Sequence, residues 1–440
     1  MNVSVIGFGH IGSVISSVLS SKGCKVTGID LNLNLVNEFK NGNSPISEPN
    51  LQDIILSSLN SKNLTITDTY DSIRSSEVVI ITVGTPLNPD NEADLSGLKK
   101  CCDDIEPYLR SGQLIILKST VPPGVTRNIV EKSLNKNKDI DVVFSPERLA
   151  EGNAIIEFQT LPIVIGGKSN KASLKASKFW KKWLNVKTII VNNYETAEMV
   201  KLASNAWIDL NIALANDLAR LTDKLDFKID ILEAINAANS LKKGSGYINI
   251  LSPSNGVGGY CLTKDPLFLY SLGKNNGLEL NTIKAGRITN DVMPEHSSNR
   301  IITYAKSFGK RLNDFKIAIL GASFKSDSGD IRNSPVIPFI QNIKGKGINK
   351  ISVFDPLVTE SDKSKLGFYL NSSLEQSIKD VDCIAFMTGH KQFKDLSLNY
   401  LNKLSKPGCL IFDGRRYFSK NEIQNILSLG MNYRGVGRCI

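Results

Sequence analysis

Residues 3–14 read VSVIGFGHIGSV, and this stretch decides the fold of the first part of the chain. A short β-branched run, typical of a buried strand, leads into Gly7-x-Gly9-x-x-Gly12 and then into a helical stretch. Gly7 permits the tight turn, Gly9 lets a pyrophosphate approach the backbone, and Gly12 allows the helix to pack closely. The amino terminus of that helix stabilises phosphate charge, so the stretch predicts a dinucleotide site.

Asp30 closes the next strand, KVTGID, at the distance from the glycines that such a site requires. A carboxylate there accepts hydrogen bonds from the adenosine ribose and repels a 2′-phosphate, so we expect NAD rather than NADP. The candidate cofactor contacts of this turn are Gly7, Gly9, His10, Ile11, Gly12 and Asp30.

Further strand-like runs follow at residues 78–84, 114–120 and 142–147, with helical stretches between them. This alternation predicts a doubly wound α/β domain, in which ligands bind at the carboxyl ends of parallel strands. We therefore expect Thr85 and Thr120, which follow two of these strands, to lie near the cofactor. Ordinary turn chemistry is the competing explanation for either threonine taken alone.

Two carboxylates, Glu147 and Glu151, stand four residues apart in SPERLAEG, directly after a strand. Either could act as a general base through water or hold a substrate hydroxyl. A solvated loop is the simpler interpretation of this pattern by itself.

A long Ala- and Leu-rich stretch without Gly or Pro runs from Glu195 to about Leu225 and predicts one helix that links domains and forms a dimer surface. Lys201 and Asn205 share one face of it, four residues apart. Together they could stabilise the oxyanion of a tetrahedral intermediate. The competing interpretation is a lysine that extends from a helix edge into water.

Cys261 lies in SPSNGVGGYCLTKDP, a flexible, glycine-rich loop. A thiol traps an aldehyde as a thiohemiacetal, and a second oxidation turns this into a thioester. Lys264 would favour the thiolate, and Asp265 would orient the thiol or a hydrolytic water. The alternative is an inert core cysteine.

A second α/β pattern begins at Lys316, with strand-like runs KIAILG, ISVFDP, DCIAFMTGH and CLIFDG. The chain is therefore expected to be α/β, with two Rossmann-like doubly wound parallel-sheet domains joined by a long central helix and a helical dimerisation core. The expected boundaries are 1–194, 195–300 and 301–440.

Composition narrows the function classes. The chain has 440 residues, of which 41% are hydrophobic and 22% charged, and it has no apolar run long enough for a membrane span. Its strand begins too early for a signal peptide, and its seven cysteines suggest neither a disulfide framework nor a metal site, so we expect a cytoplasmic protein. The net charge of +10 comes from dispersed Lys and Arg, which favours an anionic substrate over nucleic acid.

Taken in order, these motifs resemble those of the UDP-glucose/GDP-mannose dehydrogenase family. The resemblance covers nearly the whole chain and is carried by the segments GFGHIG, GTP, KSTVPPG, SPERLAEG, ETAEMVKLASNAW, GVGGYCLTKDP, GASFKSDSGDIRNSP and FDGR. It implies an NAD-dependent, four-electron oxidation of carbon 6 of a UDP-sugar to the uronate, carried out by a homodimer whose last domain holds the nucleotide.

The resemblance also assigns roles to single residues. It implies that Cys261 is the nucleophile, that Lys201 and Asn205 stabilise the oxyanion, and that other groups manage protons and water. The implied catalytic residues are Cys261, Lys201, Asn205, Asp265, Glu147 and Thr120. Besides the glycine turn, the implied cofactor contacts are Thr85, Thr120, Glu151, Lys264 and Arg332. The implied substrate contacts are Glu147, Arg148, Leu149, Glu151, Lys201, Asn205, Tyr247, Ile250, Gly258 and Lys325.

The identity of the sugar depends on smaller features. The run Asn249–Leu251 before the GVGG loop and the pair Glu147-Arg148 resemble the N-acetylhexosamine branch, whereas Lys264-Asp265 and Asp413-Gly414-Arg415 resemble the UDP-glucose branch. Tyr247 stands where that first branch carries an arginine, and Tyr260 replaces its histidine.

We therefore expect UDP-N-acetylmannosamine or UDP-N-acetylglucosamine as substrate, with UDP-glucose as the alternative. Two remoter alternatives are a one-step hydroxyacid dehydrogenase, which needs no thiol, and a non-catalytic NAD-binding protein.

Overall fold

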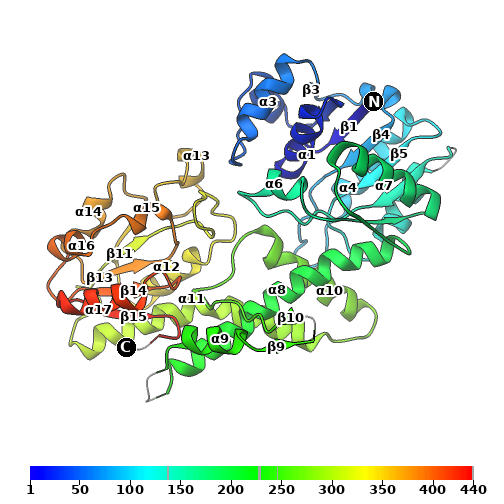
Figure 1. Cartoon of the computed structure of the whole chain (residues 1–440). Helices are drawn as coiled ribbons and strands as arrows, with labels where there is room; N and C mark the ends of the chain where they lie inside the picture. The colour runs from blue at the N-terminus through cyan, green and yellow to red at the C-terminus, as the bar shows by residue number, and fades with distance from the viewer. Residues whose placement is uncertain (136–137, 226–228, 245, 439–440) are drawn as a thin grey trace. The chain divides into compact units, whose positions relative to one another are not determined.

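The computed structural model describes residues 1–135, 138–225, 229–244 and 246–438. The chain forms two compact units: unit 1 comprises Met1–Ser204 and Leu267–Leu278, and unit 2 comprises Asn205–Pro266 and Glu279–Ile440. Two helices, α8 (Tyr194–Thr222) and α10 (Tyr260–Asn275), continue from one unit into the other (Figure 1).

Unit 1 is built on an eight-stranded sheet with strand order β3-β2-β1-β4-β5-β6-β7-β8. Its strands are β1 (Asn2–Ile6), β2 (Lys25–Ile29), β3 (Leu64–Thr67), β4 (Val78–Ile81), β5 (Leu114–Leu117), β6 (Asp141–Phe144), β7 (Ile163–Gly167) and β8 (Thr188–Val191). Neighbouring strands are parallel except for β6 and β7, which pair antiparallel.

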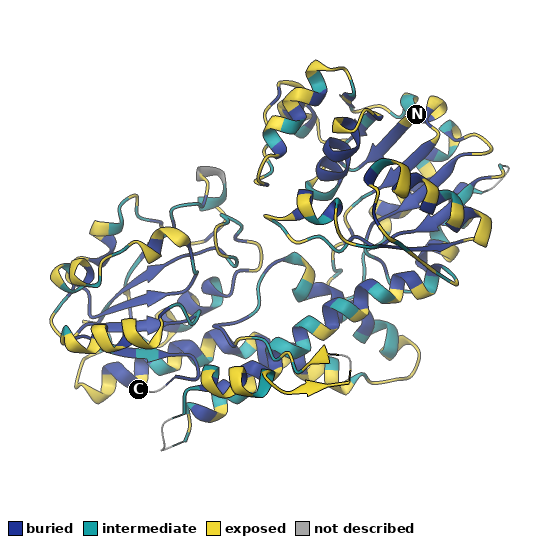
Figure 2. Ribbon diagram, viewed as in Figure 1, coloured by how far each residue is buried: buried dark blue, intermediate teal, exposed yellow. Residues whose placement is uncertain are grey.

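Both faces of this sheet are covered. Val78 and Ile80 of β4 pack in one hydrophobic cluster, whereas Val79 and Ile81 pack in another, because successive side chains of a strand point to opposite faces. Figure 2 shows the central strands buried in both units. The helices of unit 1 are α1 (His10–Ser21), α2 (Leu33–Lys40), α3 (Leu51–Asn60), α4 (Ser96–Ile105), α5 (Lys132–Leu134), α6 (Ala154–Phe158) and α7 (Asn170–Leu184), with shorter helical turns η1 (Asp71–Ser75), η2 (Glu106–Tyr108) and η3 (Thr126–Glu131).

Unit 2 contains a five-stranded, wholly parallel sheet of order β12-β11-β13-β14-β15. Its strands are β11 (Lys316–Leu320), β12 (Lys350–Phe354), β13 (Cys383–Phe386), β14 (Leu410–Asp413) and β15 (Asn432–Gly435), and a separate hairpin consists of β9 (Lys242–Lys243) and β10 (Gly246–Tyr247). Its other helices are α9 (Ile231–Asn239), α11 (Asn281–Ser307), α12 (Val336–Gly345), α13 (Glu360–Lys363), α14 (Leu374–Ile378), α15 (Lys391–Lys394), α16 (Leu398–Leu404) and α17 (Lys420–Ser428).

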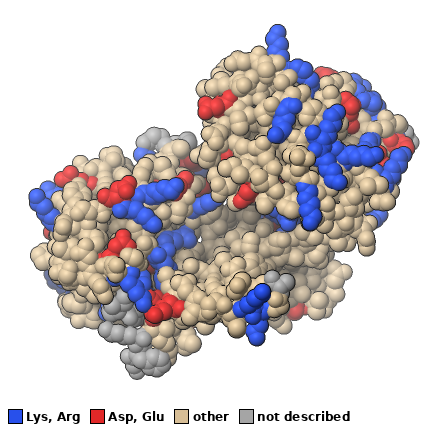
Figure 3. Space-filling model, viewed as in Figure 1, with Lys and Arg blue, Asp and Glu red and all other residues tan. Residues whose placement is uncertain are grey.

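The predicted fold class is confirmed: two doubly wound, largely parallel sheets and a long helix are present. Strands β3, β7, β8 and β15 and the antiparallel pairing of β7 with β6 were not predicted from the sequence. Lys and Arg are spread over the face shown in Figure 3, with Asp and Glu among them. Within the described part of the chain, no helix has both the length and the apolar character that crossing a membrane requires.

Candidate active site

The glycine turn between β1 and α1 is too closely packed for a side chain at Gly7 and Gly12, whereas a Cβ on Gly9 would meet no atom within 4 Å. Gly7 has a φ of +86°, and a Cβ on Gly12 would lie 1.8 Å from the Gly7 carbonyl oxygen. The Thr82 hydroxyl donates to that same oxygen at 2.6 Å and so ties the turn to the end of β4. The turn therefore holds α1 close against the sheet, as a dinucleotide site requires.

The amino end of α1 is left open for an anion. Gly9 is its N-cap, no side chain caps it, and its first turn carries no acidic residue, so main-chain N–H groups point out of the helix end. A cavity of about 530 Å³ lies there, and its lining includes Gly7, Gly9, His10, Ile11 and Asp30. The size of the cavity, the open helix end and the Asp30 carboxylate together fit a dinucleotide.

The Asp30 carboxylate also organises the turn itself. It accepts the Phe8 N–H at 2.7 Å through one oxygen and the Asn32 N–H at 2.9 Å through the other. The residue predicted to bind the ribose is therefore held in place by two main-chain donors.

Thr85 and Thr120 lie together where β4 and β5 end. The Thr85 hydroxyl donates to the Thr120 carbonyl oxygen at 2.6 Å, and Thr85 is only 3% exposed. Thr85 therefore joins the two strand-end loops, whereas the Thr120 side chain is half-buried.

Glu147 and Lys201 form a buried ion pair. One Glu147 oxygen lies 3.3 Å from the Lys201 ammonium, and the other accepts the Leu149 N–H. Arg148 donates to the Pro162 carbonyl oxygen, and Leu149 packs on the apolar core. The loop after β6 thus presents the Glu147 carboxylate to the first turns of α8. Glu151, further along the same loop, is half-buried.

Lys118, which the sequence analysis did not single out, is a second buried lysine in this region. Its ammonium donates to the Ser145 carbonyl oxygen at 3.2 Å and lies over the rings of Phe158 and Trp180. Burial lowers the pKa of Lys118 to about 8, although the Glu147 carboxylate opposes this shift. The sequence carried a signal for a buried lysine here, because Lys118 directly follows the apolar run LIIL.

Replacing Lys118 with methionine tests this pKa. The folded-state pKa is about 8, against 10.5 ordinarily, so the unfolded chain binds more protons between these values. The wild-type free energy of unfolding should therefore rise, relative to Lys118→Met, by about 1 kcal/mol between neutral pH and a pH of about 9. Urea denaturation at both pH values measures this difference. Lys175→Met, at a more exposed lysine, is the control, and an equal change there would contradict the assignment.

Glu48 was also missed, and it connects two parts of unit 1. Its side chain is 1% exposed, and its oxygens accept the N–H groups of Gly152 at 2.7 Å and Ala154 at 2.8 Å. The same carboxylate lies 3.1 Å from Nε2 of His10, at the start of α1. It therefore joins the dinucleotide turn to the loop that carries Glu147 and Glu151. The sequence around it carries little signal, because its neighbours suggest an exposed polar loop.

Glu48→Gln should raise the KM for NAD about tenfold, with a smaller effect on kcat, because the His10 contact and one N–H acceptor are weakened while the helix end stays intact. Initial rates at varied NAD concentration measure this split. Glu38→Gln, the same substitution at an exposed position of α2, is the control. An unchanged KM in Glu48→Gln would show that the loop holds its position without this carboxylate.

In unit 2, the loop before Cys261 is pressed against the segment after β11. A Cβ on Gly258 would lie 2.5 Å from Cβ of Phe324 and 2.8 Å from the Asn333 carbonyl oxygen. Gly259 has a φ of +84°, and its N–H donates to the Arg332 carbonyl oxygen at 3.0 Å. The glycines therefore serve close backbone approach, as predicted for this loop.

Cys261 is the second residue of α10 and is exposed, whereas Cys24, Cys101, Cys102, Cys383 and Cys409 are buried. The first turn of α10 has no acidic residue. A thiol at a helix amino terminus is favoured as the thiolate by the helix dipole, so this position suits a nucleophile.

Asp265 lies one turn further along α10 and is fully buried. Its carboxylate accepts from the Lys264 ammonium at 2.6 Å and from the Asn205 amide at 2.6 Å. Lys264 therefore pairs with Asp265 and lies over the Tyr260 ring at 5.4 Å. Three of the predicted catalytic and cofactor residues are thus joined in one polar cluster.

Pro266 interrupts the hydrogen bonds of α10. A proline has no N–H, so the Leu262 carbonyl, next to Cys261, lacks its helical donor. Arg287 supplies one at 3.3 Å, and this guanidinium is itself held by buried Asp209 at 2.6 Å. Arg287 therefore supports the backbone of the nucleophile, a role that the sequence analysis did not predict.

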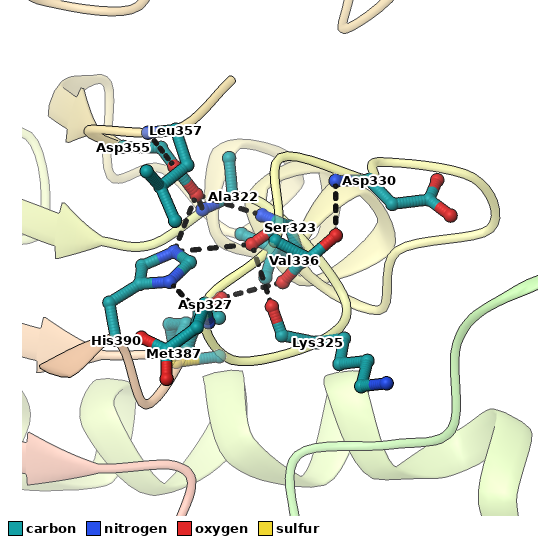
Figure 4. A network of polar contacts seen from close by, with 12 residues as sticks. Ala322, Ser323, Lys325, Asp327, Asp330, Val336, Asp355, Leu357, Met387 and His390 are labelled. Carbon is teal, nitrogen blue, oxygen red and sulfur yellow. Dashed lines mark hydrogen bonds and ion pairs between the residues drawn. The ribbon is translucent and has the colours of Figure 1, made fainter. Parts of the chain in front are cut away.

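The segment after β11 is held by a buried network around His390 (Figure 4). Nδ1 of His390 accepts the Asp327 N–H at 3.0 Å, and Nε2 faces Asp355 at 3.2 Å. Asp355 in turn accepts the N–H groups of Ala322 and Ser323 at 2.7 and 3.0 Å. Although burial opposes it, hydrogen bonds from His390 and the main chain lower the pKa of Asp355.

Lys325 extends away from this network (Figure 4), and the Arg332 guanidinium pairs with Asp330 at 2.9 Å. Because Gly258 and Gly259 pack on the same segment, Lys325 and Arg332 are anchored to the nucleophile loop within unit 2.

Tyr247 and Ile250 lie elsewhere in unit 2. They line a depression of about 410 Å³ beside α8 with Trp207, Leu210 and Leu214, and Tyr247 is 65% exposed. The residues that line this depression come from α8 and from the segment Tyr247–Ile250.

Among the described residues, no group of three or more His, Cys, Asp or Glu side chains is arranged to hold a metal ion.

The fold and these two groups of residues define a dehydrogenase with one dinucleotide-binding sheet and a second Rossmann-like sheet. Models of the UDP-glucose/GDP-mannose dehydrogenase family match the chain in three parts: the NAD-binding domain at residues 1–184, the central domain at 195–292 and the UDP-binding domain at 318–420. The chain belongs to the UDP-glucose/GDP-mannose dehydrogenase family and is an NAD-dependent oxidoreductase.

Among similar proteins, a UDP-N-acetyl-D-mannosamine dehydrogenase of Methanococcus vannielii is 33% identical over 95% of this chain and 93% of its own length. The solved structure of a UDP-D-ManNAc dehydrogenase from Pyrococcus horikoshii is 30% identical, with a TM-score of 0.88 over 100% of this chain and 99% of that one. A UDP-glucose dehydrogenase structure from Pyrobaculum islandicum is 26% identical, with a TM-score of 0.87 over 100% of this chain and 98% of that one.

Proposed function

We propose that this enzyme oxidises carbon 6 of UDP-N-acetyl-D-mannosamine to the carboxylate in two successive NAD-dependent steps. The observation that carries the proposal is the exposed Cys261 thiol at the amino end of α10, one turn from the buried Asp265 cluster. A simple alcohol dehydrogenase needs no such thiol.

In this mechanism NAD serves as the hydride acceptor of both oxidations. The first oxidation gives an aldehyde, and the Cys261 thiolate adds to its carbonyl carbon to form a thiohemiacetal. Lys201 and Asn205 stabilise the oxyanion, as a positive charge and an amide donor do at developing negative charge.

The second oxidation removes a hydride from the same carbon and leaves a thioester on Cys261. Water, activated by Asp265 or Glu147 and ordered by Thr120, breaks the carbon–sulfur bond and releases carboxylate and thiol. Alcohol, two NAD⁺ and water thus become carboxylate, two NADH and three protons, and the reactive aldehyde stays attached to the protein.

For the remaining positions we propose cofactor and substrate contacts. Gly7, Gly9, Ile11 and Asp30 hold the dinucleotide, with Thr85, Glu151, Lys264 and Arg332 near its nicotinamide or phosphates. Arg148, Leu149, Gly258 and Lys325 contact the substrate. The functional domains are then 1–194 for NAD, 195–300 for the helical core and 301–440 for the nucleotide of the sugar.

UDP-glucose is the second candidate, supported by the similarity to the Pyrobaculum islandicum structure and by the Lys264-Asp265 pair. The names of the relatives and the Glu147-Arg148 pair favour the N-acetylated sugar.

The test is the amount of NADH formed per sugar consumed, with UDP-N-acetylmannosamine, UDP-N-acetylglucosamine and UDP-glucose supplied separately. Two NADH per sugar with UDP-N-acetylmannosamine alone is the expected result. Two NADH with UDP-glucose alone would move the proposal to the second candidate. One NADH per sugar would refute the thioester route.

We further propose a cytoplasmic homodimer assembled through α8. On this helix Trp207, Leu214 and Leu221, spaced seven residues apart, are 52%, 50% and 56% exposed. Large apolar side chains in one exposed row are typical of a subunit interface. The exposed Tyr247 beside this row would then reach the partner's substrate.

Trp207→Glu should convert the dimer to a monomer at micromolar concentration, because a buried charge replaces a large apolar contact. Light scattering after gel filtration measures the mass. Leu427→Glu, at a 40% exposed leucine of α17, is the control and should leave the dimer intact. A wild-type monomer would contradict the proposal.

A further inference from the structure

A second large cavity, of about 560 Å³, lies in unit 2 between the end of α8, the second half of α11 and β15. The basic side chains in its lining are Arg220, Lys224, Arg300, Arg434 and the imidazole of His296. The volume is typical of sites for small molecules, and the lining comes from three separate elements.

The acidic groups of this cavity are already engaged. Asp223 has a side chain that is 1% exposed, and it pairs with Arg300, with His296 at 2.8 Å and with the Gly437 N–H at 3.2 Å. Glu295 is on the surface and pairs with Lys346 at 3.2 Å. Arg220 pairs with Asp217 at 2.8 Å and Arg300 pairs with Asp223, so the excess of positive charge in the lining comes from Lys224 and Arg434.

The donors that remain are arranged for an anion with several oxygens. Lys224 is exposed, Arg434 is half-buried, and Thr303 adds a hydroxyl group to the same lining, whereas the Ser307 hydroxyl already donates to the Tyr304 carbonyl oxygen at 2.8 Å. Guanidinium and ammonium groups around a concave site favour phosphate oxygens, which accept several charge-assisted hydrogen bonds at once.

This cavity is separate from the nucleophile loop. Arg287 of α11 contacts the Leu262 carbonyl beside Cys261, whereas the cavity lining on that helix runs from Val292 to Ser307. At a rise of about 1.5 Å per residue, the lining begins about 7 Å further along the helix and ends about 30 Å away.

We propose that this cavity is a binding site for a small phosphate-bearing anion, distinct from the sites for NAD and for the UDP-sugar. Asp223, one of the lining residues, contacts both α11 and the segment that follows β15. An anion held by Lys224, Arg300 and Arg434 therefore links the helices to the five-stranded sheet and stabilises unit 2 against unfolding.

Inorganic pyrophosphate is the probe. Titration calorimetry of the full-length enzyme, saturated beforehand with UDP and NAD so that the nucleotide sites are filled, should show one site per chain. The affinity should fall as salt rises. Lys224→Gln and Arg434→Gln should each weaken binding about tenfold, because each removes one charge-assisted hydrogen bond.

Lys350→Gln is the control, since this lysine of β12 is 48% exposed and lies outside the lining. It should bind pyrophosphate as the wild type does. The proposal would be overturned if the wild type did not bind pyrophosphate, for instance because a partner subunit covers the cavity. It would also be overturned if both variants bound pyrophosphate with wild-type affinity. Lys224→Gln should form NADH at the wild-type rate. A loss of pyrophosphate binding in this variant therefore tests the cavity separately from the proposed reaction.

Discussion

Cys261→Ser should lower the rate of NADH formation from a UDP-sugar by about a thousandfold or more, because a serine hydroxyl has no low-energy anion with which to trap the aldehyde. The helix end that favours the thiolate would favour a neutral hydroxyl much less. Steady-state NADH formation and the yield of uronate measure the loss. A full rate with one NADH per substrate would indicate a one-step dehydrogenase.

Cys409→Ala is the matched control for this variant. Cys409 is 1% exposed and precedes β14, remote in sequence from the proposed chemistry. Its replacement should cost about 1 kcal/mol of unfolding free energy and leave kcat unchanged. A similar loss of activity in both variants would mean that the serine variant acts through stability.

Asp265→Asn should affect stability and catalysis together. The carboxylate is fully buried between the Lys264 ammonium and the Asn205 amide, so an amide in its place leaves a buried cation without its counter-charge. We expect a loss of about 3–5 kcal/mol in unfolding free energy, as for other broken buried pairs. We also expect kcat to fall about a hundredfold or more, since the second step loses a base.

Asp330→Asn separates the loss of stability from the loss of catalysis. It breaks the Asp330–Arg332 ion pair, in which the arginine is 52% exposed, and so shows what the loss of a more exposed pair costs. Its loss should cost less than about 1 kcal/mol. Urea denaturation gives the stability of each variant, and rates measured well below the unfolding transition give kcat. Equal stability losses would contradict the buried-pair explanation for Asp265.

Local patterns predicted the parts of the fold that are fixed locally. The glycine turn, Asp30 and the strand-like runs predicted the first sheet, and the Ala- and Leu-rich run predicted α8 to within a few residues. The antiparallel pairing of β7 with β6 was missed because a short apolar strand carries no mark of its direction.

The supporting residues were missed for a related reason. Glu48 meets Gly152 and Ala154 from about a hundred positions away in sequence, and Arg287 reaches the Leu262 carbonyl only because Pro266 leaves it open. Such contacts depend on tertiary packing and leave no periodic signal. The motif residues Asn205, Lys264 and Asp265, by contrast, were predicted as site residues, and they do lie together.

The two sheets repeat one construction. Asp30 accepts the Phe8 N–H after β1, and Asp355 accepts the Ala322 N–H after β11. Each turn also begins with a glycine of positive φ, Gly7 and Gly321.

The two copies differ in the segment beyond the turn. After Gly7, α1 begins within three residues, whereas after Gly321 the chain passes through a long loop before α12 begins at Val336. The cofactor and a UDP-sugar both carry a pyrophosphate, so an enzyme with two identical turns would confuse them. Because a helix begins directly after only one of the two turns, we expect the dinucleotide pyrophosphate to bind at that helix end and the diphosphate of a UDP-sugar to be held by different contacts.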